Sequence, residues 1–223
     1  ANGAITQTAG TLDIGGRTLL ASDNNITLNN NGNNFNEVLV TSANDVFLTD
    51  INEIQLGSSD KSAPFDQPFN ISGTLNITAN GTITDLDNPT GLNNLTVGGV
   101  TTLNANGNDI TLNNANNFST VAAKGANVTL NDSNGIDLGA STITGTLGVT
   151  AGAAITNSGK LTVTNGTTTL NANGNDITLN NANDFSTVVA NGANVTLNDS
   201  NGIILGASSI SGTLQVTAGG NIT

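Results

Sequence analysis

The stretch NANGNDITLNNAN occupies residues 104–116 and returns unchanged at residues 171–183, which sets a repeat of 67 residues (171 − 104 = 67). When residues 103–156 are laid over residues 170–223, only nine of the fifty-four paired positions differ. An older copy is visible upstream, where NITLNNNGNNFNEV at residues 25–38 matches the same pattern with one extra residue. Self-similarity at a fixed period is typical of repeat architectures, so the chain is expected to be a repeat protein.

The copies predict the organisation of the whole chain. We expect a single continuous solenoid over residues 1–223, made of about three copies of the repeat. The first copy, residues 1–100, is diverged and carries an insertion at residues 60–69, and residues 101–167 and 168–223 form the other two. No linker separates the copies, because each runs directly into the next.

Apolar residues alternate with small or polar residues throughout each copy. Segments such as DITLN, NVTLND, GIDLG, TLGVT and KLTVTN place two apolar side chains on one side of the backbone, as Ile110 and Leu112 do around Thr111. Each segment is followed by Asn, Asp or Gly, which favour tight turns. Very short strands in a long repeat predict a β-solenoid, because one turn cannot bury its apolar face without its neighbours.

The spacing of these strands predicts the number of coils. Ile110, Val128, Leu147, Leu161 and Ile177 follow one another at intervals of 18, 19, 14 and 16 residues. These intervals indicate three or four coils in each copy and roughly ten to thirteen coils in the chain. At ~4.8 Å for each stacked strand, the rod would be about 50 to 60 Å long. The predicted fold class is therefore all-β, a parallel β-helix.

The composition excludes several classes of partner and cofactor. The formal net charge is −12, and Arg17, Lys61, Lys124 and Lys160 are the only cations, so we expect no nucleic-acid binding. The absence of Cys and His excludes disulfides and structural zinc. No run approaches the ~18 apolar residues of a membrane span, so no membrane insertion is expected.

Three phenylalanines stand at equivalent places in the three copies. They are Phe35, Phe118 and Phe185, each after an Asn-rich segment and before an apolar strand. Large aromatic side chains in a chain with few aromatics favour burial. We expect these three residues to be core residues that fill the same interior corner.

The sequence NNFSTVAAKGANVTLNDSNGIDLGASTITGTLGVTAGAAITNSGKLTVTNGTTTL at residues 116–170 resembles the repeats of filamentous haemagglutinin-type exoproteins. These are large repetitive bacterial surface and secreted proteins. The resemblance covers residues 101–223 well and residues 1–100 loosely. It implies a right-handed parallel β-helix, an extracellular or cell-surface location, export through an outer-membrane secretion partner, and a role as a shaft or adhesin.

Two motifs contain the oxygen ligands that calcium prefers. GNDITL at residues 107–112 is similar to the calcium-binding nonapeptide of secreted β-rolls, but it recurs every 67 residues rather than every nine. NDSNGIDL offers Asp132, Asn134 and Asp137, yet the second copy has Ile204 in place of Asp137. We therefore predict an Asx turn at a coil corner and no metal site.

Candidate catalytic residues are few. Asp85 and Asp87 could lie about 7 Å apart on one side of a strand, a possible carboxylate pair for glycan hydrolysis. The sequence TDLDNPTG predicts a turn there instead. Because the chain has no His, Cys, Tyr or Trp, it offers no catalytic triad or thiol nucleophile. We expect no enzyme activity, no catalytic residues and no cofactor.

One segment departs from the repeat. Aligning the first copy with the second leaves ten extra residues, DKSAPFDQPF, at residues 60–69. Insertions in solenoids leave one face as loops, often on the binding face. Pro64, Phe65, Pro68 and Phe69 are the candidate docking residues. The aromatic pair would form a knob that packs either against its own rod, which we favour, or against a partner.

Three classes of function remain open from the sequence. The leading hypothesis is a stalk or filament-forming rod, whose partners are further repeats or other copies stacked end to end. The alternative is an adhesin module that binds a glycan or a host surface. A third class is an Asn-rich segment that assembles as cross-β without defined coils.

Overall fold

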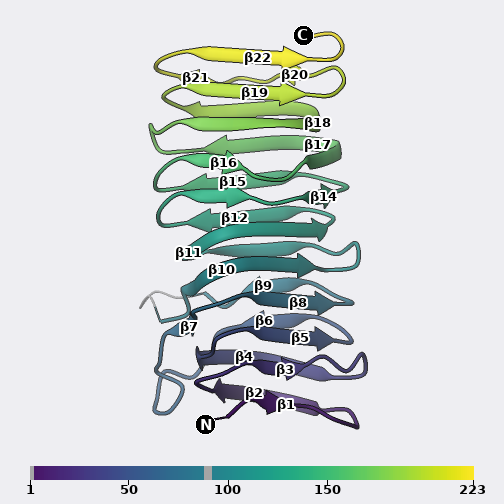
Figure 1. The fold of residues 1–223 in the computed structure, drawn as a ribbon, viewed down its shortest axis with the longest axis vertical. Coiled ribbons are helices and arrows are strands. Elements are labelled where there is room, and N and C mark those ends of the chain that lie inside the picture. The colour runs from purple at the N-terminus through teal and green to yellow at the C-terminus, as the bar shows by residue number, and fades with distance from the viewer. Residues whose placement is uncertain (1–2, 88–91) are drawn as a thin grey trace.

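The computed structural model describes residues 3–87 and 92–223, and these residues form strands and turns but no helix. Figure 1 shows the strands stacked into one elongated rod with the two chain ends at opposite ends of the stack. Neighbouring coils pair in parallel along the whole rod. The predicted all-β, parallel β-solenoid without disulfides is confirmed.

The strands are short, apart from a few that continue around a corner of the rod. In chain order they are β1 (Ile5–Thr6), β2 (Asp13–Ala21), β3 (Ile26–Leu28), β4 (Asn34–Ser42), β5 (Val46–Asp50), β6 (Ile54–Leu56), β7 (Phe69–Ile71), β8 (Leu75–Ala79), β9 (Ile83–Asp85), β10 (Leu95–Asn104), β11 (Ile110–Gly125), β12 (Val128–Asp132), β13 (Ile136–Leu138), β14 (Ser141–Ile143), β15 (Leu147–Ala151), β16 (Ile155–Asn157), β17 (Leu161–Asn171), β18 (Ile177–Gly192), β19 (Val195–Asp199), β20 (Ile204–Leu205), β21 (Ser209–Ile210) and β22 (Leu214–Ala218).

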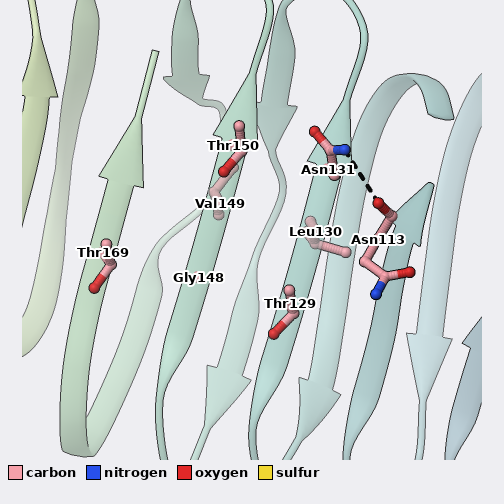
Figure 2. A pocket seen from close by; sticks show the side chains of 8 residues that line it. All are labelled: Asn113, Thr129, Leu130, Asn131, Gly148, Val149, Thr150 and Thr169. Carbon is pink, nitrogen blue, oxygen red and sulfur yellow. Dashed lines mark hydrogen bonds between the residues drawn. The ribbon is translucent and has the colours of Figure 1, made fainter. Parts of the chain in front are cut away.

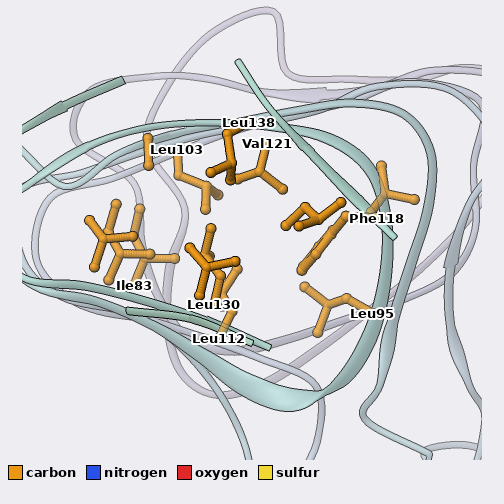
Figure 3. Packing of buried hydrophobic residues seen from close by; sticks show 14 of the residues in the cluster. Ile83, Leu95, Leu103, Leu112, Phe118, Val121, Leu130 and Leu138 are labelled. Atoms are coloured by element: carbon orange, nitrogen blue, oxygen red, sulfur yellow. The ribbon is translucent and has the colours of Figure 1, made fainter. Parts of the chain in front are cut away.

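The rod has two broad walls, and each coil contributes one strand segment to each wall. The inward residues of wall A are stacked in the order Ile54, Ile83, Ile110, Val128, Leu147, Thr168 and Val188. Those of wall B are stacked in the order Ile5, Ile26, Val46, Leu75, Thr101, Val121 and Leu138. A neighbouring column on the same wall continues in the order Ile136, Ile155, Ile177, Val195 and Leu214. Figure 3 shows the core between them, with Ile83, Leu112 and Leu130 facing Leu103, Val121 and Leu138.

The walls meet at two edges. We call edge 1 the side where the chain passes from wall A to wall B, and edge 2 the side where it returns. The repeated letters NANGND form a tight turn at an edge, because Asn106 and Gly107 both have positive φ (48° and 89°). Asn173 and Gly174 repeat this conformation. Asn and Gly tolerate the left-handed region, so they can form the corner without strain.

The rod makes about ten turns, at the low end of the predicted range. The predicted steps from Ile110 to Val128 and from Val128 to Leu147 are confirmed as register pairs. The next predicted step is wrong, because Leu147 pairs with Thr168 and Leu161 pairs with Ser141. Leu161 lies where the chain turns edge 2, before β17 rejoins wall A.

The three equivalent phenylalanines are buried, with Phe35 and Phe118 1% exposed and Phe185 2% exposed. They do not share one corner, as the sequence predicted. Phe118 stacks on Val97 at edge 1, whereas Phe185 stacks on Val163 at edge 2. Phe35 lies between β3 on wall B and the wall A part of β4, so it also belongs to edge 2.

Candidate functional site

The inserted loop at residues 60–69 is the one segment singled out by the sequence as a docking surface. It follows β6 on wall A and leads into β7 at edge 1, where Figure 1 shows it projecting from the side of the rod. The second copy makes the same connection with only Gly139 and Ala140 between its strands. The loop therefore adds surface without adding a coil.

The base of the inserted loop is held by the buried side chain of Asn93. Its amide oxygen accepts a hydrogen bond from the backbone N–H of Ser58 at 3.0 Å, and its amide nitrogen donates to the Ser58 carbonyl at 3.1 Å. Gly57 permits this contact, since a Cβ at that position would lie 2.7 Å from Cγ of Asn93. Gly57 also has a φ of 110°, which a side chain would strain.

A charged cluster forms where the loop meets wall A. Nε of Arg17 lies 3.3 Å from Oε2 of Glu37, and Nη1 of Arg17 lies 3.6 Å from Oδ2 of Asp60. These are the only ion pairs within residues 3–87 and 92–223. Glu37 also accepts hydrogen bonds from the backbone N–H and hydroxyl of Ser59, at 2.9 and 2.6 Å.

The same cluster positions Phe65. The guanidinium carbon of Arg17 lies 6.0 Å from the centre of the Phe65 ring, at the limit of a cation–π contact. The Phe65 N–H donates to the Ser62 carbonyl at 2.8 Å. Hydrogen bonds from the Ser62 hydroxyl and N–H, with a smaller contribution from Arg17, lower the pKa of Asp60, so this carboxylate stays charged.

The four predicted docking residues fall into three environments. Phe69 is fully buried as the first residue of β7, and Phe65 is half-buried against the core. Pro64 and Pro68 are exposed. The two phenylalanines therefore do not form a paired knob at the surface. Most of the aromatic surface of the loop packs against its own rod, and the prolines remain available to a partner.

A second surface feature was not predicted from the sequence. Wall A is hollowed at Gly148, which lies between Thr129 and Thr169 in the strand register (Figure 2). The groove measures about 290 Å³ and is lined by Thr hydroxyls and by Asn113 and Asn131. A Cβ on Gly148 would be 3.9 Å from the nearest atom, so the groove exists because this position lacks a side chain.

The equivalent position in the third copy is Gln215. The difference between Gly148 and Gln215 was the sequence signal for this groove. Hydroxyl and amide groups on one open face can hydrogen-bond to a polar ligand, and no charged side chain lines the groove.

The motif NDSNGIDL forms a corner, and the predicted Asx turn is present. Oδ1 of Asp132 accepts a hydrogen bond from the Asn134 N–H at 2.8 Å. Asp137 lies on the outer surface of wall B, where it accepts hydrogen bonds from the hydroxyls of Thr120 and Thr156, both at 3.2 Å. The two carboxylates are thus engaged separately. No group of three or more acidic side chains in the described ranges is placed to hold a metal ion.

Buried carboxylates recur at these corners. Asp50 and Asp132 each accept a backbone N–H from a phenylalanine on the adjacent coil, and burial raises the pKa of both despite these hydrogen bonds. Asp85 is also buried, with a raised pKa, and accepts bonds from the N–H groups of Asn113 and Asn114. Asp87 is exposed, so the candidate carboxylate pair does not share one environment.

Within the described part of the chain, no helix is long and apolar enough to cross a membrane.

No curated protein and no solved structure matches this chain. A family model described as repeats of unknown function (DUF5649) matches it in four consecutive segments, residues 1–42, 43–123, 125–191 and 192–223. The third segment spans 67 residues (191 − 125 + 1 = 67), the length of the repeat read from the sequence. These segments cover almost the whole chain, which therefore belongs to this family of repeats of unknown function (DUF5649).

Proposed function

We propose that this chain is a structural or adhesive segment of a bacterial cell-surface or secreted fibrous protein, in which it acts as a rigid stalk or filament-forming rod. It works by length and stiffness, without enzymatic activity or a cofactor. The bacterial and extracellular setting rests on the resemblance of residues 116–170 to haemagglutinin-type repeats. Export through an outer-membrane secretion partner is part of the same proposal.

The observation that carries the proposal is the continuous parallel pairing of strands along the rod. Wall B runs from Ile5 to Leu214, and every coil is hydrogen-bonded to the next. Bending such a rod would stretch backbone hydrogen bonds on one wall and compress side chains on the other. Continuous stacking therefore supports a stiff spacer.

The partners proposed for the rod are further repeats or other copies stacked end to end. In the outermost coil, Leu214 and Ile222 continue the inward stacks and are 48% and 50% exposed. Another coil stacked on this end would bury these side chains and pair the free strand edges, which is how solenoids gain stability.

Electron microscopy of the material isolated from its source tests this function. Continuous filaments whose axial repeat matches this segment would support a structural polymer. Discrete rods with a distinct tip would support an adhesin shaft instead. Flexible, collapsed chains without straight segments would contradict the rod.

A glycan- or host-surface-binding module is the alternative, and the inserted loop is the observation that favours it. The loop interrupts the repeated surface and presents Pro64 and Pro68 beside the charged cluster around Arg17. Glycan-array binding that is lost when residues 59–68 are removed would favour this alternative. Equal binding by the two proteins, or none by either, would count against it.

A further inference from the structure

Equivalent residues in successive copies lie on opposite walls of the rod. Following wall A upward from Ile110, the bonded partners are Val128, Leu147 and Thr168, which makes three full turns. The residue equivalent to Ile110 in the next copy is Ile177, nine residues beyond Thr168. Ile177 pairs with Ile155 on wall B. One 67-residue repeat therefore makes three and a half turns.

The same alternation holds in the diverged first copy. One isoleucine recurs at equivalent places in the successive copies, at Ile5, Ile83, Ile155 and Ile222, and it changes wall every time, in the order B, A, B and A. The intervals differ, because 83 − 5 = 78, 155 − 83 = 72 and 222 − 155 = 67. The strand pairs nevertheless give the same number of turns, three and a half, from Ile5 to Ile83 and from Ile83 to Ile155.

The half turn also explains the phenylalanine corners. Phe35 and Phe185 occupy edge 2, and Phe118, in the copy between them, occupies edge 1. A whole number of turns would have placed all three at one edge. Side chains on the walls follow the same rule, since Thr129 lies on wall A and its equivalent Thr196 lies on wall B.

We infer that the rod is two-sided: each repeat presents its surface on the face opposite to that of its neighbours, and the true structural period is two repeats. Two repeats make seven coils, about 34 Å at ~4.8 Å for each coil. A partner that recognises one repeat can then bind from both faces of the rod. Gain or loss of one repeat rotates all following repeats by half a turn about the rod axis. Gain or loss of two repeats leaves the following repeats on their original faces.

This inference rests on the strand register and not on the proposed function. Because the chain has no Cys, pairs of spin labels can be attached to introduced cysteines in the full chain without background. The test pair is Thr129→Cys with Thr196→Cys. The matched control is Thr129→Cys with Val189→Cys, since Val189 lies three strands above Thr129 on the same wall.

Pulsed electron paramagnetic resonance then measures the label distances. In the control pair, three strand spacings separate the backbones of residues 129 and 189 by about 14 Å. In the test pair, the backbones of residues 129 and 196 should be about 20 Å apart, because these residues lie on opposite walls that are ~10 Å apart. The test labels also point away from each other, so their distance should exceed the control by ~10 Å or more.

A whole number of turns would place Thr196 on wall A, at most one strand spacing, ~4.8 Å, beyond Val189. A difference of about 5 Å or less between the two pairs overturns the inference, and a larger difference supports it. The exposed equivalents Asn113→Cys and Asn180→Cys provide a second test pair with the same expected result.

Discussion

Oδ2 of Asp132 accepts a hydrogen bond from the backbone N–H of Phe118, 2.7 Å away on the neighbouring coil. Asp50 makes the same bond to Phe35 at 2.6 Å, and Asp199 makes it to Phe185 at 2.7 Å. Each copy of the repeat therefore has one buried carboxylate that joins two coils at a phenylalanine corner. The bond fixes the register of the coils, because only the correct register brings the acceptor to that N–H.

Replacing Asp132 with Ala should destabilise the rod by about 2 kcal/mol, because the Phe118 N–H would be buried without an acceptor. Urea denaturation followed by circular dichroism measures the loss. Asp23→Ala is the control, since Asp23 is exposed, and its effect should stay within about 0.5 kcal/mol. Equal stability of the two variants would refute this role for Asp132.

The strand pattern was readable from the sequence wherever a strand lies flat on a wall. Ile110 and Leu112 alternate with Thr111, and their stacking on β12 follows directly from the 18-residue interval. Leu161 and Val163 show the same alternation but lie at edge 2. A period of two gives which side of the strand is buried, not which side of the rod the strand occupies.

The inserted loop was located from the sequence, but its inner boundary was not. Phe69 was counted as a loop residue, although Phe69-Asn70-Ile71 has the apolar–polar–apolar pattern of a strand and forms β7. Alignment with Ser141-Thr142-Ile143 of the second copy was the available signal. The charged cluster could not be predicted, because Arg17, Glu37 and Asp60 come together only after the coils stack.

The three buried carboxylates with raised pKa values predict that mild acidification stabilises the rod. Burial raises the pKa of Asp50, Asp85 and Asp132 above the ordinary value of 3.8. Between 3.8 and the raised value the folded chain binds more protons than the unfolded chain, so stability falls as the pH rises through this window. The favourable contribution is fully present below the unfolded pKa and is lost as the pH rises through the raised pKa.

Thermal unfolding at pH 7 and pH 4 in the same high-salt buffer measures this effect, with salt screening the repulsion of the net charge of −12. The melting temperature should rise as the pH falls. The melting temperature of Asp85→Asn should rise less on acidification than that of the parent chain. The next copy already has an asparagine, Asn157, at the equivalent position. A lower melting temperature at pH 4 than at pH 7 for the parent chain would contradict the sign.

The inward hydroxyl of Thr168 predicts a stabilising substitution. Thr168 is fully buried between Leu147 and Val188, and its Oγ1 makes no hydrogen bond. A buried polar group without a partner costs free energy, so Thr168→Val should stabilise the rod by about 1 kcal/mol. The outward neighbour Thr169 is exposed, and Thr169→Val should have no such effect in the same denaturation assay.

The boundary of the inserted loop predicts two different outcomes for two deletions. Removing residues 59–68 joins Ser58 to Phe69 and gives a connection as long as Gly139-Ala140-Ser141 in the second copy, so the rod should stay folded. Removing residues 60–69 also deletes the buried ring of Phe69 and should cost about 3 to 5 kcal/mol more. Equal denaturation midpoints for the two proteins would show that Phe69 does not belong to the core.

Removing one whole repeat should shorten the rod without unfolding it. Deletion of residues 104–170 joins Leu103 to Asn171 and recreates the native sequence LNANGNDITL at the junction, so β10 can continue into the turn at Asn173 and Gly174. The rod should lose three and a half coils, about 17 Å at ~4.8 Å for each coil, in its maximum dimension by small-angle scattering.

Deletion of residues 104–153, which removes fifty residues (153 − 104 + 1 = 50), is the control, because it joins strands out of phase. That control should lose cooperative unfolding, since a broken register exposes apolar side chains and leaves strand edges unpaired. If the two deletions unfold alike, the 67-residue repeat is not the exchangeable unit of the rod.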